Sequence, residues 1–138
     1  MMVKCVANGV NSVFQRNILA HSNPKGSWPI KMGDSYMVYG LLLWNGNLHY
    51  LIVNRFKGIY FHPVFCPAEL FETTDTRLPK DWYFSFRGTE RENDAVWGYQ
   101  ELALVPKHLE EMLESEDDAV AILIERMKEI DEYFSQSK

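Results

Sequence analysis

The chain has 138 residues, of which 46% are hydrophobic, 14% aromatic and 24% charged, which indicates one folded domain and excludes disorder for most of its length. The net charge is −5 and is uneven, because residues 1–89 carry nine Lys/Arg against five Asp/Glu, whereas residues 90–138 carry five against fourteen. A nucleic-acid binder needs a basic surface that displaces counterions from phosphates, so we expect no direct nucleic-acid binding.

Residues 1–35 form a polar segment with many turn signals, among them Asn23-Pro24. We expect loops there, with one short helix near residues 12–20. The first residues lack the continuous apolar stretch and the small-residue cleavage site of a secretory signal, so we expect a cytosolic protein. In that reducing compartment the two cysteines, Cys5 and Cys66, are expected to be free thiols.

The strongest strand signals lie between residues 36 and 64. Residues 36–44 are apolar on both alternating faces, which predicts a central strand that is covered on both sides. They end at Asn45-Gly46, the preferred pair for a type I′ hairpin turn, and residues 48–53 form the returning strand. Residues 59–64 predict a third strand, which Pro63 places at an edge or a strand end because proline cannot donate a ladder hydrogen bond.

The next segment, residues 65–81, contains two prolines and a polar run, which indicates a long connection with one helical turn near residues 68–71. A fourth strand is predicted over residues 82–87. There Trp82, Phe84 and Phe86 alternate with more polar neighbours, a pattern typical of a strand with one buried and one wetter face. We expect most of the aromatic rings to lie in the core.

The last third of the chain has helical periodicity. Asp94 is a candidate cap for a short helix through residues 97–104, and Pro106 suits the first turn of another helix. In the last helix Ser115 and Asp118 resemble a capping box. An apolar stripe supports this helix and consists of Val120, Leu123, Met127, Ile130 and Phe134.

These elements predict a single α+β domain. Its parts are a loop-rich segment over residues 1–35, a mainly antiparallel sheet of about four strands over residues 36–87, and an acidic helical segment over residues 90–138. Helices from the C-terminal third should pack on the sheet. No apolar run approaches the roughly 18 to 20 residues of a membrane-spanning helix, so we expect no membrane association.

Candidate catalytic or metal-binding residues are His49, His62 and Cys66, because imidazole and thiolate bind zinc and can form a nucleophile with its base. Their spacing matches no known ligand pattern, since the sequence has neither C-x-x-C nor H-E-x-x-H. Gly-rich phosphate loops and the G-x-S-x-G elbow are absent too. We therefore expect no catalytic residue, no metal site and no cofactor.

The most distinctive feature is a run of six carboxylates within nine residues: Glu110, Glu111, Glu114, Glu116, Asp117 and Asp118. Such a run can be a solvated helix junction that keeps the protein soluble. It can also be a docking surface, because dense carboxylates accelerate association with basic partners, and a cationic nuclease is such a partner.

The strand region resembles small bacterial immunity proteins of polymorphic-toxin and contact-dependent growth inhibition systems. The resemblance spans roughly residues 36–104 and consists of aromatic and turn positions. The positions are Tyr39-Gly40, Trp44-Asn45-Gly46-x-Leu48-His49-Tyr50, Phe61-x-Pro63-Val64, Pro67-x-x-Leu70-Phe71, Trp82-x-Phe84 and Trp97-Gly98-Tyr99. It implies a protein that binds a cognate toxin domain in the cytoplasm and blocks its active site or substrate entry, and it specifies no contact residue.

The leading hypothesis is therefore a non-catalytic binding protein whose acidic residues 110–118 meet a basic toxin. The alternative is a small enzyme or ligand-binding domain with a pocket lined by His49, Tyr50, His62, Cys66 and aromatic residues. A third possibility is a structural subunit that dimerises through its aromatic surface.

Overall fold

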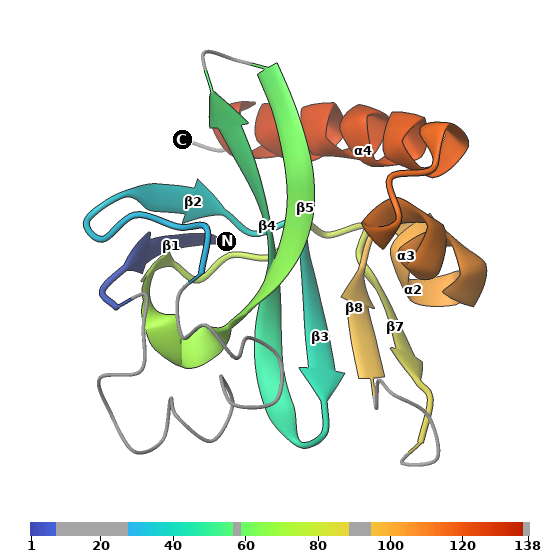
Figure 1. Ribbon diagram of the computed structural model, residues 1–138, viewed down its shortest axis with the longest axis horizontal. Helices are drawn as coiled ribbons and strands as arrows, with labels where there is room; N and C mark the ends of the chain where they lie inside the picture. Colours follow the sequence, from blue (N-terminus) through green and yellow to red (C-terminus); the bar gives the residue numbers. More distant parts are fainter. Residues whose placement is uncertain (8–27, 57–58, 89–94, 137–138) are drawn as a thin grey trace.

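A computed structural model describes residues 1–7, 28–56, 59–88 and 95–136, and the helix predicted near residues 12–20 lies outside these ranges (Figure 1). The described chain has the predicted α+β architecture. Its strands are β1 (Met2–Cys5), β2 (Ser35–Met37), β3 (Gly40–Trp44), β4 (Asn47–Phe56), β5 (Ile59–Pro67), β6 (Phe71–Asp75), β7 (Tyr83–Phe86) and β8 (Ala95–Gly98). Its helices are the 3₁₀ turn η1 (Ala68–Leu70), α2 (Gln100–Leu104), α3 (Pro106–Leu113) and α4 (Asp117–Gln136).

The strands form two antiparallel sheets, with the orders β2-β1-β6 and β5-β4-β3-β8-β7. The predicted hairpin joins β3 to β4, and its turn residues Asn45 and Gly46 have φ values of 51° and 77°, as a type I′ turn requires. Strand β3 lies at the centre of the larger sheet, and β5, which contains Pro63, lies at one edge. These three predictions are confirmed.

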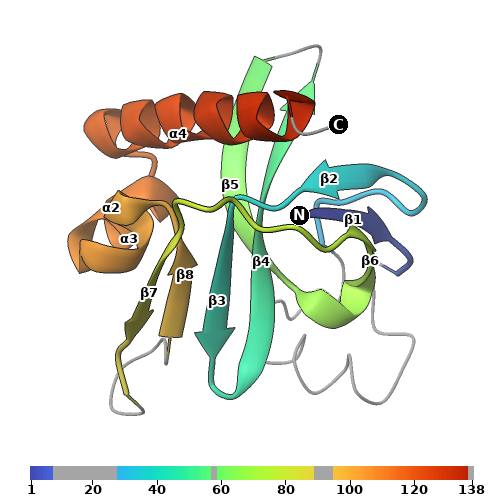
Figure 2. The ribbon, with the colours of Figure 1, turned by 180° about the vertical axis from the view of Figure 1, so that it is seen from behind.

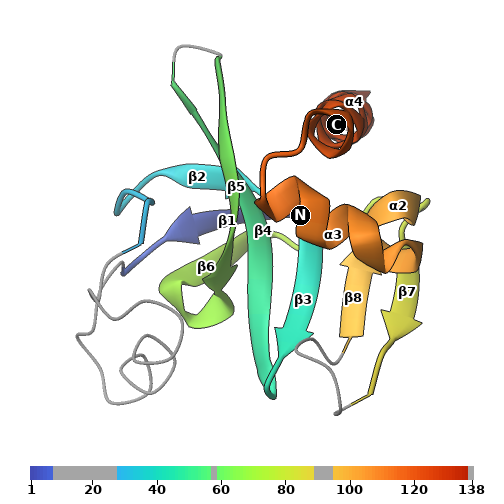
Figure 3. The same cartoon turned by 45° about the vertical axis from the view of Figure 1, so that its right-hand side comes forward.

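The two faces of the larger sheet belong to different cores. Leu42 lies in a cluster with residues of α2, α3 and α4, whereas its neighbour Leu41 lies in a cluster with residues of β1 and η1. Successive side chains of a strand point to opposite faces, so one apolar strand can serve both layers. In Figure 3 helix α3 lies in front of β3 and β8, and the small sheet lies beyond β4 and β5.

The sheet is wider than the predicted four strands over residues 36–87. Residues 36–44 form two strands, because β2 pairs with β1 of the small sheet before the chain crosses to the larger sheet at Val38 and Tyr39. Residues 95–98, expected to belong to a helix, form β8 between β3 and β7. The predicted helix is therefore shorter and begins at Gln100. Because β8 pairs with a strand on each side, its backbone N–H and C=O groups form sheet hydrogen bonds. These tertiary contacts outweigh the local helical pattern of its residues.

The connection from β6 to β7 links the two sheets. Figure 2 shows it crossing beneath α4, from the small sheet to the far edge of the larger one. Helix α4 buries the predicted stripe, with Leu123, Met127, Ile130 and Phe134 in the core, while Val120 is half-buried and Ala119 takes the deeper position. Among the described helices none combines the length and the apolarity that crossing a membrane requires.

A pair of glycines lets the helices approach the sheet closely. Gly40 of β3 and Gly98 of β8 are cross-strand partners, and Leu102 of α2 lies directly over both. A Cβ atom on Gly98 would lie 2.6 Å from Leu102 Cδ2, and one on Gly40 would overlap with the same atom. Leu102 is fully buried, so its side chain has little room to move away.

We predict that Gly98→Ala lowers the free energy of unfolding by about 1–3 kcal/mol, because it overpacks this contact. Leu102→Ala alone should cost about 2–5 kcal/mol by leaving a cavity. In the double variant the new methyl group occupies part of that cavity, so the two losses should be less than additive in urea unfolding. Leu70→Ala, in the other core cluster, is the matched control. Its loss of unfolding free energy should simply add to that of Gly98→Ala in the double variant. Fully additive losses for Gly98→Ala and Leu102→Ala would contradict the contact.

Candidate functional site

The six carboxylates of the acidic run gather where α3 ends and α4 begins, and we call this surface the acidic junction. It consists of Glu110 and Glu111 on α3, Glu114 and Glu116 in the turn, and Asp117 and Asp118 in the first turn of α4. All are exposed except Glu111, which is half-buried. The structure therefore brings the predicted partner-binding residues together on one accessible surface.

The turn between the two helices has a defined backbone geometry. The Ser115 N–H donates to the Met112 carbonyl at 3.1 Å and the Glu116 N–H donates to the Glu111 carbonyl at 2.9 Å. With Ser115 at φ 61°, these bonds form a Schellman motif that ends α3. The predicted capping box of Ser115 is therefore wrong, because Ser115 ends α3 in the left-handed conformation and does not begin α4.

A contact to the sheet holds the acidic junction in place. Nδ1 of His62, on β5, and Oγ of Ser115 form a hydrogen bond of 2.8 Å. The contact joins two positions that are 53 residues apart. It fixes the acidic junction beside the β5 edge of the larger sheet.

Most of the negative charge of the acidic junction is left without an internal counterion. Lys107 pairs with Glu111 at 3.4 Å, one helical turn apart. The other five carboxylates form no ion pair with any side chain that the structure describes. Asp117 and Asp118 interact favourably with the amino terminus of α4, which explains two of the six charges as helix stabilisers. The remainder gives the surface an excess of negative charge.

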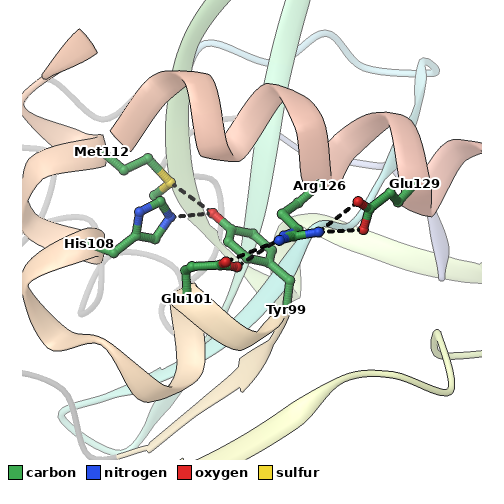
Figure 4. Close-up of polar contacts among 6 residues, drawn as sticks. All are labelled: Tyr99, Glu101, His108, Met112, Arg126 and Glu129. Atoms are coloured by element: carbon green, nitrogen blue, oxygen red, sulfur yellow. Dashed lines mark hydrogen bonds and ion pairs between the residues drawn. The ribbon is translucent and has the colours of Figure 1, made fainter. Parts of the chain in front are cut away.

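Beneath the acidic junction, α3 is joined to the sheet by a buried polar contact (Figure 4). The hydroxyl of Tyr99 lies 2.7 Å from His108 Nε2 and 3.6 Å from the Met112 sulfur. Since Nδ1 of His108 has no described partner, the favourable tautomer carries its proton on Nε2. His108 then donates to Tyr99, and Tyr99 donates to Met112. Burial lowers the pKa of His108 and keeps the imidazole neutral.

Arg126 joins α4 to α2 (Figure 4). Its guanidinium donates two hydrogen bonds to Glu101, at 3.0 and 3.1 Å, and two more to Glu129, at 2.7 and 2.6 Å. The fork geometry of arginine suits such paired contacts. The hydrogen bonds from Arg126 lower the pKa of the Glu101 carboxyl, which therefore stays ionised. Together with the contact of Tyr99 with His108, this pair links the three helices beneath the acidic junction.

An open cavity of about 260 Å³ lies between α4 and the β6–β7 connection. Aromatic and charged side chains line it together, among them Trp82, Tyr83, Tyr133, Lys80 and Asp81. Within the described part of the chain its lining contains no histidine, cysteine or serine. The sequence did not predict this cavity, because its lining comes from three separate segments, within residues 79–83, 99–100 and 126–133, that meet only in the folded chain.

The alternative pocket of His49, His62 and Cys66 does not form. Tyr50 pairs with Cys66 and both lie in the cluster beside the small sheet, whereas His49 lies on the opposite face, against Trp44. His62 is exposed and bound to Ser115. Burial raises the pKa of the Cys66 thiol to about 12, so it is not a reactive thiolate. Among the described residues no three acidic, histidine or cysteine side chains converge to hold a metal ion.

Comparisons with known proteins give no relative: no family model matches the chain, and no curated protein and no solved structure matches it.

The two buried histidines predict an acid-sensitive fold. Burial lowers the pKa of His49 and His108 below the ordinary value of 6.5. Each therefore binds a proton on unfolding, so the free energy of unfolding falls as the pH drops below about 6.5. We expect His108→Gln to lose less stability than the natural protein between about pH 7 and 5.

Urea unfolding across this pH range measures the effect. His49→Gln should reduce the loss in the same direction, and the double variant should show the weakest dependence on pH. If the free energy of unfolding of both single variants depended on pH as that of the natural protein does, the result would contradict the neutral state of these histidines in the folded chain.

Proposed function

We propose that this protein is a non-catalytic immunity-type protein that binds a basic toxin domain through the acidic junction. The observation that carries the proposal is the gathering of six carboxylates, five of them exposed, where α3 ends and α4 begins, with a single described lysine paired to them. The resemblance of residues 36–104 to toxin immunity proteins supports the same class. His49, His62 and Cys66 lie apart, so these three residues do not form the pocket on which the enzymatic alternative was based.

The internal contacts that hold the acidic junction favour binding. Its backbone is held by the Schellman motif and by His62, and its helices are held by the Tyr99–His108 and Arg126–Glu101 contacts. A preformed surface loses little conformational entropy when a partner docks, so more of the interaction energy contributes to affinity. This arrangement suits an inhibitor that must bind its target quickly and tightly.

The charge of the acidic junction indicates the chemistry of its partner. A nuclease domain presents cationic side chains to a polyanionic substrate, and those side chains are complementary to a dense group of carboxylates. Binding in the producing cell's cytoplasm would cover the cationic surface and exclude the substrate. Because attraction between exposed charges is long-ranged, it would act mainly on the rate of association.

The first test is protection of cells. The proposal expects a toxin gene beside the gene for this protein. The probe is the C-terminal domain of that toxin, expressed in a bacterial host with and without the protein. We expect the toxin domain alone to stop growth and co-expression to restore it. Failure to protect, together with no binding between the purified proteins, would contradict the proposed function.

The second test reverses charge within the acidic junction. Glu110→Lys combined with Glu114→Lys should slow association with the toxin domain by on the order of tenfold and weaken its dependence on salt. The control combines Glu125→Lys with Glu132→Lys, two exposed positions of α4 outside the acidic junction that change the net charge equally. Stopped-flow measurements at two salt concentrations compare the variants. Equal slowing by both pairs would show a general charge effect and contradict a specific surface.

A further inference from the structure

Among the described strands, β7 forms one edge of the larger sheet and exposes aromatic side chains. It is the last strand in the order β5-β4-β3-β8-β7, and no described strand pairs with its outer side. Phe84 is 51% exposed and Phe86 is 70% exposed, although their alternation with more polar residues predicted a buried row. Edge strands of this kind present free backbone groups that can pair with another chain.

The exposed rings extend an apolar row across the sheet. Phe84 pairs with Trp97, which pairs with Leu41, and its ring lies 4.6 Å from the Trp97 ring, centroid to centroid. Phe86 lies on the same face of the sheet, two residues further along β7, and pairs with Ala95. The part of this face at β4 and β5 is covered by the small sheet, whereas the part at β7 is exposed. None of the four residues of β7 is charged.

We propose that a second copy of this chain pairs antiparallel with β7, so that the two larger sheets become continuous. In an antiparallel pair with two-fold symmetry, opposite residues share a face. A register centred on Ser85 places Ser85 opposite its own copy and Phe84 opposite Phe86 of the other copy. Both exposed rings of each copy thus meet an aromatic partner, at the cross-strand spacing that favours ring contacts.

The absence of charge on β7 favours a second copy over a charged partner. The strand offers no group for an ion pair, and its aromatic row is complementary to itself. Because an aromatic side chain offers about 150–250 Å² of surface, the exposed fractions of 51% and 70% amount to roughly 240 Å² in each copy. The exposed rings of both copies together supply less than half of the roughly 1,200 Å² that a stable interface buries. The strand backbones and Trp97 would add to the buried area. The dimer should therefore be weak and depend on protein concentration.

This interface is independent of the proposed function. The acidic junction lies beside β5 through the contact of His62 with Ser115, and β7 is the opposite edge of the same sheet. Dimerisation would leave both acidic junctions exposed. Loss of the dimer and loss of toxin binding are thus separate outcomes of separate variants.

Analytical ultracentrifugation tests the proposal on the full chain, over protein concentrations from roughly 10 to 500 µM. We expect a monomer–dimer equilibrium for the natural protein and a monomer at every concentration for Phe86→Lys. Met32→Lys is the matched control, because Met32 is an apolar side chain, 57% exposed, outside β7. A natural protein that remains monomeric throughout, or a Phe86→Lys variant that still dimerises, overturns the proposal.

A cross-link tests the register and does not depend on the fold of the lysine variant. Ser85→Cys should form an intermolecular disulfide under mild oxidation, because the symmetric register brings the two introduced thiols together. Ser35→Cys, at the exposed first position of β2, is the control and should stay monomeric. The native Cys5 and Cys66 are buried and should not take part. No cross-link for Ser85→Cys, or equal cross-linking of both variants, overturns the register.

Discussion

The close contact of Leu102 with Gly40 and Gly98 is the constraint on which the helical layer depends. Helix α2 is only five residues long and follows directly on β8, so its position is set by how near it can approach the sheet. A side chain at either glycine would lift it away. Tyr99 and His108 would then lose the geometry that ties α3 to this layer.

The two edges of the larger sheet have opposite chemistry. At the β5 edge the carboxylates of the acidic junction surround the contact of His62 with Ser115, and attraction there is electrostatic and long-ranged. At the β7 edge the exposed rings of Phe84 and Phe86 lack charge, and attraction there requires direct apolar contact. A single sheet therefore separates the surface that we propose for a basic partner from the surface that we propose for a second copy.

Two buried histidines stabilise the fold only while they are neutral. His49 and His108 are both nearly inaccessible, and each has a ring nitrogen without a described hydrogen-bond partner. A neutral imidazole tolerates such a position far better than a charged one. His108, which anchors α3 to Tyr99, and His49, within the β3–β4 hairpin, thus make the fold sensitive to acid.

The sequence by itself determined the α+β class, the hairpin at Asn45-Gly46, the start of α3 at Pro106 and the apolar stripe of α4, because these depend on local backbone preferences and periodicity. It also identified the carboxylates of the acidic junction, which lie close together in the chain. Only the tertiary structure decided that residues 95–98 form a strand, that His62 meets Ser115 and that β7 exposes its aromatic row. Those outcomes depend on contacts between residues far apart in sequence, which no local pattern encodes.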